Sequence, residues 1–304
     1  MAPPRKLAFQ YVRHSNPETL IEFLMRRFHY HTRAEWIDRI ATGAVTIDGA
    51  RAEPGHILRS KEQIAYLPPA IPEPPVDERF TVLYEDDDIL AVSKSGNIPS
   101  TPSGKYWHNC LRHVLQRRLG LSEVHAIHRL DRETSGINLF AKNRKAAGLL
   151  GDSFHAGLVR KTYAAILVGH LPSANILVNA PLQPAGSLVS IKQAVHPDGR
   201  ASQTRFLLRA LLPRACLVDV LPETGRTHQI RAHAAFLGHP VWGDHLYGVP
   251  EQQFIDYIHD PNRNWSDRHL LHAKGLAFPH PSSGKEVVVQ CGEEKLLEEF
   301  WVGG

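Results

Sequence analysis

The chain has 304 residues, of which 42% are hydrophobic and 22% are charged, and 35 Lys and Arg against 31 Asp and Glu give a net charge of +4. These values are typical of a folded globular protein of one or two domains and exclude a wholly disordered, collagen-like or coiled-coil chain. No run approaches the roughly 18 apolar residues of a membrane span, and the N-terminus lacks the apolar core of a secretory signal, so we expect a cytoplasmic protein with no membrane partner.

The first 66 residues form a small basic part of the chain, with ten Lys and Arg against seven Asp and Glu. Capping patterns and an apolar stripe predict two helices, and short alternating runs predict strands with a tight turn at Asp48-Gly49. The helices are expected to begin at Asn16-Pro17 and at Thr32, and the strands to cover Val45–Ile47 and Gln63–Tyr66.

Four arginines are spread over the two predicted helices and their connection: Arg26, Arg27, Arg33 and Arg39. From composition alone they form either an ordinary solvated face or a surface that binds phosphate. The two helices followed by GAVTIDG and PGHIL resemble the alpha-L RNA-binding module of a small-subunit ribosomal protein and of tyrosyl-tRNA synthetases. The resemblance covers residues 17–66 and implies that these arginines bind RNA, although His31-Thr32-Arg33 replaces the Ser-Arg pair usual in that module.

The segment PPAIPEPP has five prolines in eight positions and predicts an extended linker, because proline cannot donate to a strand ladder. We therefore expect a small domain over residues 1–67, a linker over 68–78 and a large domain over 79–304. Strand and helix patterns alternate without a regular repeat in the large part, which favours a mixed α and β fold. Strands are expected at Phe80–Tyr84, Ile89–Val92, Ile137–Ala141, Lys161–Val168, Ser202–Leu211 and Ala215–Leu221, and helices at Asn109–Leu119, Arg144–Phe154 and His228–Leu237.

The densest polar segment, HRLDRETSG, stands directly before an apolar run that reads as a strand. Ordinary turn chemistry explains such a loop in most proteins. The charges favour a functional interpretation, because Asp131 lies between Arg129 and Arg132 and nearby positive charge keeps a carboxylate ionised. An ionised carboxylate there can act as a nucleophile or as a base.

A second polar segment, residues 223–231, stands before a predicted helix. Thr227 can cap this helix, and Arg226 lies just ahead of its N-terminus, where anions are stabilised. His228 and Arg231 share one helical face. The segment is therefore either an amphipathic helix with a solvated basic face or a site for a carboxylate, a phosphate or both. In the preceding strand pattern Tyr163 is a third candidate, although a tyrosine in an apolar strand is most often part of the core.

These segments together resemble the RluA family of pseudouridine synthases. The resemblance covers residues 80–290 and depends on HRLDRETSG, VRKTYAAILVG, HPDGRASQTRF, ETGRTHQIRAHAAFLGHPVWGDHLYG and LHAKGLAFPHPSSGK, in the family's order. It implies an α+β catalytic domain with a mixed, largely antiparallel sheet, flanking helices and a central cleft. The implied activity is the isomerisation of specific uridines in structured RNA, by base flipping and aspartate-dependent cleavage and rejoining of the glycosidic bond.

The resemblance also implies roles for individual residues. Asp131 matches the family's invariant aspartate, Tyr163 the tyrosine that stacks on the target base, and Arg226 the basic residue that forms a salt bridge with the aspartate. Arg132 matches an arginine implicated in flipping the base out of its helix. Further contacts to RNA are expected from Arg129, His228 and Arg231.

Ribosomal RNA is the favoured substrate and transfer RNA is the alternative. The segment Ser95–Ser100 departs from the family's usual Pro-x-Gly pattern, and this departure concerns the choice of RNA more than the chemistry. Whether Asp131 acts first as a nucleophile or as a base stays open. Residues 251–268 have no functional interpretation.

The sequence also bears on two other function classes. A metal hydrolase is disfavoured, because the three cysteines are scattered and no HExxH is present, so we expect no metal. A catalytically inactive RNA-binding protein is the main alternative. The sequence has neither GxGxxG nor GxxxxGK[ST], and isomerisation transfers no electrons or phosphate, so we expect no cofactor. We expect a monomer.

Overall fold

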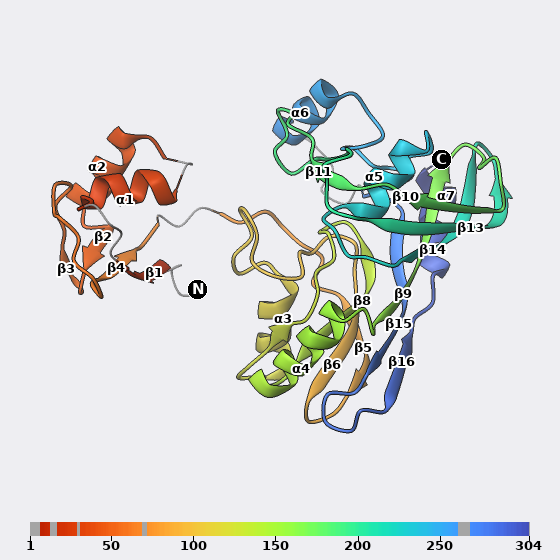
Figure 1. Cartoon of the computed structure of the whole chain (residues 1–304), viewed down its shortest axis with the longest axis horizontal. Helices are drawn as coiled ribbons and strands as arrows, with labels where there is room; N and C mark the ends of the chain where they lie inside the picture. Colours follow the sequence, from red (N-terminus) through yellow and green to blue (C-terminus); the bar gives the residue numbers. More distant parts are fainter. Residues whose placement is uncertain (1–6, 13–16, 29–30, 69–71, 261–267, 304) are drawn as a thin grey trace. The chain divides into compact units, whose positions relative to one another are not determined.

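The computed structural model describes the chain except for residues 1–6, 13–16, 29–30, 69–71, 261–267 and 304. Two compact units make up the chain, Met1–Glu73 and Pro74–Gly304 (Figure 1). The division falls inside the segment PPAIPEPP. Each unit has its own buried apolar core, so each is described by itself.

The first unit packs two helices and a four-stranded antiparallel sheet around one core, in which Trp36 is completely buried. The helices are α1 (Leu20–Arg27) and α2 (Arg33–Ala41), and the strands lie in the order β1 (Leu7–Gln10), β4 (Gln63–Tyr66), β2 (Val45–Ile47) and β3 (Ala50–Arg51). Asp48 and Gly49 have φ angles of 50° and 80° between β2 and β3, which confirms the predicted tight turn.

Both helices of the first unit begin with a complete capping box. For α2 this is the predicted pair, Thr32 with Glu35. For α1 the predicted start is wrong: Thr19 is the N-cap and pairs with Glu22. Asn16, the expected cap, lies outside the described residues. The structure therefore starts α1 at Thr19, three residues after the expected cap.

The second unit is built on a ten-stranded sheet, and its described pairs are antiparallel except where β15 runs parallel to β8. This confirms the expected α+β fold. The strand order is β10 (Asn175–Asn179), β13 (Gln203–Leu212), β14 (Ala215–Pro222), β9 (Arg160–Val168), β15 (Leu271–Pro279), β8 (Ser135–Ala141), β6 (Ile89–Lys94) and β5 (Phe80–Glu85), with β16 (Glu286–Gln290) beside β15 and β7 (His125–Ala126) beside β8.

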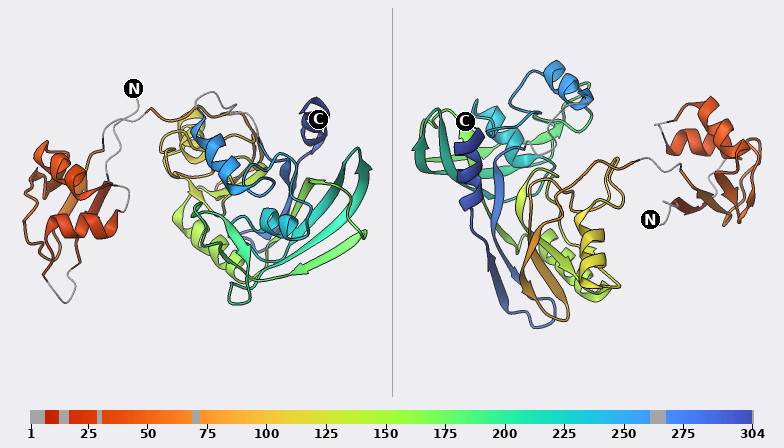
Figure 2. Two further views of the ribbon diagram at one scale, coloured as in Figure 1. Left: turned by 90° about the horizontal axis from the view of Figure 1, so that it is seen from above. Right: turned by 180° about the vertical axis from the view of Figure 1, so that it is seen from behind.

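The described helices of this unit are α3 (Leu111–Leu119), α4 (Arg144–His155), α5 (Gln229–Phe236), α6 (Glu251–His259) and α7 (Glu294–Gly303), and β11 (Leu182–Pro184) and β12 (Gln193–Val195) form a small separate sheet. Helices α5 and α7 cover opposite faces of the large sheet, whereas α6 buries none of its residues. Alternate residues of β9 share a core with α5 or with α7: Ala165 lies in the cluster of Ile230, and Ala164 in that of Phe300. Figure 2 shows the long strands bent into a curved layer, with α5 inside the curve.

The predicted strands and helices of this unit all exist within two residues of their predicted bounds. The short strands β7, β10, β11 and β12, the pair β15 and β16, and the helices α6 and α7 were not predicted. The expected cap of α5 is wrong. His228, not Thr227, is the N-cap residue, it has a φ of 53°, and its side chain caps nothing.

Candidate active site

A cleft of about 530 Å³ in the second unit brings three distant segments together. Its walls come from the loop before β8, from β9, and from the turn that leads into α5. Asp131, Tyr163 and Arg226, the three residues predicted to be catalytic, all line it. A larger hollow of about 720 Å³ lies around Trp242 and Glu299 and contains none of the three.

Hydrogen bonds to its backbone groups hold the loop that carries Asp131 in place. The hydroxyl of Ser100 accepts from the amide of Leu130 at 3.0 Å, and the carbonyl of Arg132 accepts from the amide of Ile98 at 3.1 Å. The amine of Lys94, which is fully buried, donates to the same carbonyl at 3.2 Å. Burial lowers the pKa of Lys94 to about 7. The segment Ser95–Ser100, where the sequence departs from the family pattern, therefore supports the Asp131 loop directly.

The carboxylate of Asp131 faces the cleft, with 31% of the side chain exposed. Its Oδ2 accepts from Nη1 of Arg231 at 2.9 Å and lies 3.9 Å from Nε2 of His228. Burial acts to raise the pKa of Asp131, but electrostatic interactions with His228, Arg231 and His269 outweigh it, so the pKa lies below its ordinary value. Asp131 is therefore ionised at neutral pH.

The salt-bridge partner of Asp131 corrects the sequence prediction. We expected Arg226, but the ion pair is made by Arg231, five residues further along the chain and inside α5. The Nε of Arg226 donates instead to the carbonyl of Ala201 at 3.1 Å. Arg231 was expected to contact RNA, yet its side chain is only 8% exposed. It therefore forms an ion pair with Asp131 and is not part of the solvent-exposed surface.

Arg231 is itself held by a second carboxylate. Its Nε donates to Oδ2 of Asp244 at 2.6 Å and its Nη2 to Oδ1 at 2.8 Å. Asp244 is fully buried, and although burial alone would raise its pKa, Arg231 brings the pKa down to about 2. The guanidinium also lies over the ring of Tyr247, 5.1 Å from the centroid. Arg231 is thus a fixed, permanently charged group.

His228 is uncharged at neutral pH. Burial lowers the pKa of its imidazole to about 4. Its Nδ1 lies 3.1 Å from the hydroxyl of Tyr247, and that hydroxyl accepts from the amide of Gln193 at 2.8 Å. A tyrosine hydroxyl has one proton to donate, which suits Nδ1 as its acceptor and leaves the imidazole proton on Nε2, facing Asp131. Because His228 is neutral, Arg231 is the cation that keeps Asp131 ionised at pH 7.

Arg132 does not line the cleft, contrary to the role expected for it. Its Nη1 donates to Asn97 at 2.6 Å and its Nη2 to Glu133 at 2.7 Å. Arg129, two residues before Asp131, is exposed and lines the cleft. Within the described part of the chain Arg129 makes no ion pair. The arginine available to RNA beside Asp131 is therefore Arg129.

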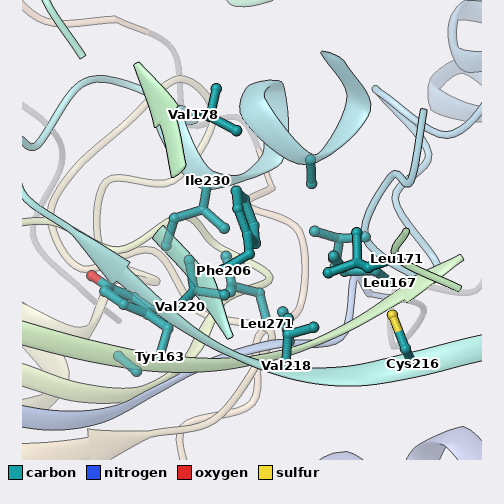
Figure 3. Packing of buried hydrophobic residues seen from close by; sticks show 14 of the residues in the cluster. Tyr163, Leu167, Leu171, Val178, Phe206, Cys216, Val218, Val220, Ile230 and Leu271 are labelled. Atoms are coloured by element: carbon teal, nitrogen blue, oxygen red, sulfur yellow. The ribbon is translucent and has the colours of Figure 1, made fainter. Parts of the chain in front are cut away.

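Tyr163 lies on β9 with its ring at the boundary between core and cleft. It belongs to the apolar cluster under α5 and is 9% exposed. Figure 3 shows it at the margin of that cluster, with the hydroxyl turned away from Phe206 and Val218. Burial raises its pKa, so the hydroxyl stays protonated. The ring thus offers a flat apolar surface to the cleft, while its burial also fits the ordinary core role.

Two further cations lie in the cleft. Lys161, two residues before Tyr163 on the same strand, donates to the carbonyl of Thr224 at 3.0 Å and lines the cleft with Arg226. Burial and the charge of Arg226 lower the pKa of Lys161. Sequence reasoning missed Lys161, Asp244 and Tyr247. No local sequence pattern singles these residues out, but all three lie inside the segments quoted for the family resemblance.

The four arginines of the first unit that were predicted to bind RNA occupy different environments. Arg26 is bound to Glu18 by two hydrogen bonds of 2.7 and 2.9 Å. Arg27 lies over the rings of Phe9 and Phe28. Arg33 is exposed at the start of α2, and the Nε of Arg39 is buried without a hydrogen-bond partner. Among the described residues, therefore, Arg27, Arg33 and Arg39 form no ion pair with a carboxylate, whereas Arg26 does.

Among the described residues, no three His, Cys, Asp or Glu side chains are grouped so that they could hold a metal ion. No helix in the same part of the chain is long and apolar enough to cross a membrane.

Comparison with known proteins gives a consistent result. Residues 88–236 match a family model described as RNA pseudouridylate synthase. The chain is 36% identical over 225 residues to ribosomal large subunit pseudouridine synthase C of Vibrio parahaemolyticus, covering 73% of this chain and 68% of that protein. It is 34% identical to the mitochondrial tRNA pseudouridine(32) synthase of Saccharomyces cerevisiae, covering 76% and 49%. The structure of human RNA pseudouridylate synthase domain containing 1 matches with a TM-score of 0.59 and 26% identity, covering 72% and 86%.

Proposed function

The chain belongs to the RluA family of RNA pseudouridine synthases, and from this premise we propose that it isomerises uridine in structured RNA within the cleft that holds Asp131. The observation that carries the proposal is the ionised carboxylate of Asp131, which faces a cleft shared with Tyr163 and is backed by the buried cation of Arg231. This arrangement supplies an anionic reacting group, an aromatic surface on which a nucleobase can stack, and a positive charge that keeps the carboxylate ionised.

The reaction needs a base that has left its helix, since the cleft cannot admit a duplex. Extrusion costs a few kcal/mol of stacking and pairing. The ring of Tyr163 recovers part of this by stacking on the uracil, an interaction worth about 1–3 kcal/mol per base on other aromatic platforms. Tyr163 therefore holds the uracil against the wall of the cleft.

Asp131 starts the chemistry, either by attacking the sugar or by taking a proton from it. The bond between N1 and C1′ breaks, the uracil turns while it remains in the cleft, and C5 forms the new bond to C1′. The proton on C5 leaves and N1 takes up a proton, so the atoms balance without an external oxidant or reductant. Arg231 holds Asp131 ionised and aimed at the sugar before this first step.

Cations around the cleft receive the RNA backbone. Arg129, Lys161 and Arg226 line the cleft and are not paired with a carboxylate in the described structure, so RNA phosphates can neutralise them. In this proposal Arg226 contributes through RNA binding, and Arg129 takes the position beside the target base that the sequence suggested for Arg132.

The substrate we favour is ribosomal RNA, with transfer RNA as the alternative. The relatives reported above are named for one or the other, so similarity alone supports both. We propose that residues 1–67 bind RNA through the alpha-L-like arrangement of α1 and α2, that residues 68–78 link this domain to the catalytic domain over 79–304, and that the enzyme works as a monomer in the cytoplasm.

The direct test uses the purified chain and RNA transcribed with uridine tritiated at C5. Because pseudouridine formation removes the proton on C5, the wild-type chain releases tritium in a single-turnover reaction on its substrate. Asp131→Asn, which keeps the size of the side chain, binds the same RNA and releases none. RNA binding by the wild-type chain with no tritium release from ribosomal or transfer RNA would favour the inactive RNA-binding protein instead.

A further inference from the structure

Arg231 is shared between two carboxylates in an unequal way. Asp244 takes two hydrogen bonds, from Nε and Nη2, and Asp131 takes one, from Nη1. The pair with Asp244 is of the bidentate kind, in which a planar guanidinium meets both oxygens of a carboxylate. The Nε and Nη2 edge of Arg231, which can bind both oxygens of a carboxylate, is therefore occupied by Asp244, a residue that does not line the cleft.

Asp244 is well placed for this task. Its side chain is fully buried, and its Oδ1 also accepts from the amides of Leu246 and Tyr247 at 2.9 Å each. These backbone bonds fix the position of the Asp244 carboxylate on the turn that follows α5. They do not depend on any residue that lines the cleft. A fixed carboxylate in turn fixes the plane of the guanidinium, because two parallel bonds define its orientation.

The consequence appears at Asp131. Only Oδ2 of Asp131 is engaged, by Arg231 at 2.9 Å and with His228 at 3.9 Å. Within the described residues Oδ1 has no side-chain or backbone donor. If the two-donor edge of Arg231 were released, it could turn to Asp131 and bind both oxygens, which would leave neither of them for the substrate.

We propose that Asp244 is a positioning residue of the reaction, which holds Arg231 by its Nε and Nη2 edge so that a single hydrogen bond aims Asp131 and leaves Oδ1 available to the sugar. The inference rests on the proposed function of the cleft. It assigns Asp244 no contact with RNA. Its effect passes entirely through Arg231.

Asp244→Asn is the sharpest variant. The amide oxygen keeps the backbone bonds from Leu246 and Tyr247, while the amide nitrogen places a donor against the Nε of Arg231. We expect the single-turnover rate constant on 5-tritiated RNA to fall about 10- to 100-fold, the usual range for losing a residue that orients a reacting group. The RNA dissociation constant should stay within about twofold, because Asp244 is buried.

Asp219→Asn is the matched control. The carboxylate of Asp219 also binds two cations, Lys274 at 2.6 Å and Arg209 at 3.3 Å, but it does not line the cleft. Its rate constant should remain within about twofold of wild type. Circular dichroism checks that both variants are folded. If Asp244→Asn does not fold, Asp244→Ser replaces it, since a serine hydroxyl can still accept from the turn amides but cannot grip a guanidinium.

A double-mutant cycle separates positioning from a general structural role. If Asp244 acts through Arg231, Asp244→Asn adds less than about threefold to the loss caused by Arg231→Lys, because residues that act as one unit are not additive. A folded Asp244→Asn protein with a rate constant within twofold of wild type, or losses that multiply fully, would overturn the proposal.

The geometry has a test of its own that needs no activity. A crystal structure of Asp244→Asn should show Arg231 turned toward Asp131, with two hydrogen bonds between them. An unmoved Arg231 would overturn the proposal even if the variant were slow. A wild-type chain that forms no pseudouridine would instead contradict the proposed function, while this structural result would still decide whether Asp244 positions Arg231.

Discussion

At the scale of the residue, the charge state of the cleft follows from one cation. Arg231 is permanently charged and buried, and it lies between Asp131 and Asp244. His228 is neutral at pH 7 because burial lowers its pKa to about 4. Asp131 is therefore ionised, and His228 unprotonated, over the whole physiological range.

This charge state predicts a rate that hardly depends on pH near neutrality. The single-turnover rate constant should be flat between pH 8 and pH 5, because neither Asp131 nor His228 titrates there. Lys94 has a pKa of about 7, but its amine can donate to the carbonyl of Arg132 whether it is charged or neutral. It should fall only below about pH 4, as Asp131 and His228 take up protons. A rate profile over this range, with buffers of constant ionic strength, checks it. A rate that falls with an apparent pKa near 6 would contradict this assignment of charges.

The same carboxylates set the acid stability. The pKa of Asp244 is about 2 in the folded chain, below the ordinary value of 3.8 for an aspartate. A lowered pKa stabilises the folded state above the unfolded value, and the contribution is lost as the pH falls from about 4 toward 2. The fold should therefore survive at pH 5, and a loss of rate above that pH cannot be attributed to unfolding through Asp244.

Tyr163 gives the second prediction at this scale. Tyr163→Leu removes the ring and should lower the single-turnover rate constant roughly 5- to 150-fold, the equivalent of about 1–3 kcal/mol of stacking. Tyr163→Phe keeps the ring, so its loss should be clearly smaller. Tritium release measures both, and thermal unfolding controls for the partly buried position. Equal rates for wild type and Tyr163→Leu would contradict the stacking role.

The sequence segments that line the cleft could be predicted, but which residues form ion pairs across it could not. The polar segments around Asp131 and Arg226 identify the walls of the cleft correctly. Which arginine meets Asp131 depends on how α5 starts, and His228 takes a left-handed backbone conformation there. No periodicity or capping pattern signals that turn, so sequence reasoning chose Arg226 where the structure has Arg231.

At the scale of the element, one parallel pairing joins the two halves of the sheet. β8 meets β15 through His272 opposite Ser135 and Ala273 opposite Gly136. Gly136 has a φ of 103°, and a Cβ there would come within 2.2 Å of the carbonyl oxygen of Ala273. Only glycine permits both the conformation and the close approach. This contact fixes the position of β8 beside β15, and it thereby positions the loop that carries Asp131.

Gly136→Ala should therefore destabilise the second unit by about 3 kcal/mol or more. Gly148→Ala in α4 is the matched control, because nothing lies within 4 Å of its Cβ position and alanine favours a helix by about 1 kcal/mol. Urea unfolding followed by circular dichroism gives both free energies. The account of the β8–β15 contact fails if Gly136→Ala is as stable as the wild-type chain.

The long elements could be predicted because their apolar patterns are strong. β8 is buried at every position and α4 has an asparagine cap at Asn143, and both were found. The short strands β10, β11 and β12 have mixed exposure, and the pairing of β15 with three neighbours is a tertiary property. Such elements depend on partners far along the chain, which local patterns do not specify.

At the scale of the whole molecule, two units with separate cores divide the work proposed for the chain. The second unit holds the cleft. In the first unit Arg27, Arg33 and Arg39 form no ion pair with a carboxylate among the described residues, whereas Arg26 is bound to Glu18. The resemblance to an RNA-binding module and this charge balance lead to the same expectation, that the first unit adds affinity without taking part in the chemistry.

Replacing Arg27, Arg33 and Arg39 by glutamine should weaken RNA binding and lower its salt dependence. Each lost phosphate contact reduces the slope of log K against log salt by about 0.7–0.9, so three contacts reduce it by about 2–3. Arg26→Gln is the control and should change the slope by less than about one. Filter binding at several salt concentrations measures both. An unchanged slope for the triple variant would contradict an RNA-binding role for this surface.

The central claim is that Asp131 makes this chain a pseudouridine synthase, and mapping of pseudouridine in cells tests it most directly. Total RNA is treated with carbodiimide and read by reverse transcription, from cells that carry either the wild-type chain or Asp131→Asn. We predict that one or a few stops, in ribosomal or transfer RNA, are present with the wild-type chain and absent with Asp131→Asn at equal protein levels. Identical stops in both, together with no product from the purified wild-type chain on unmodified transcripts of the same RNAs, would contradict the account.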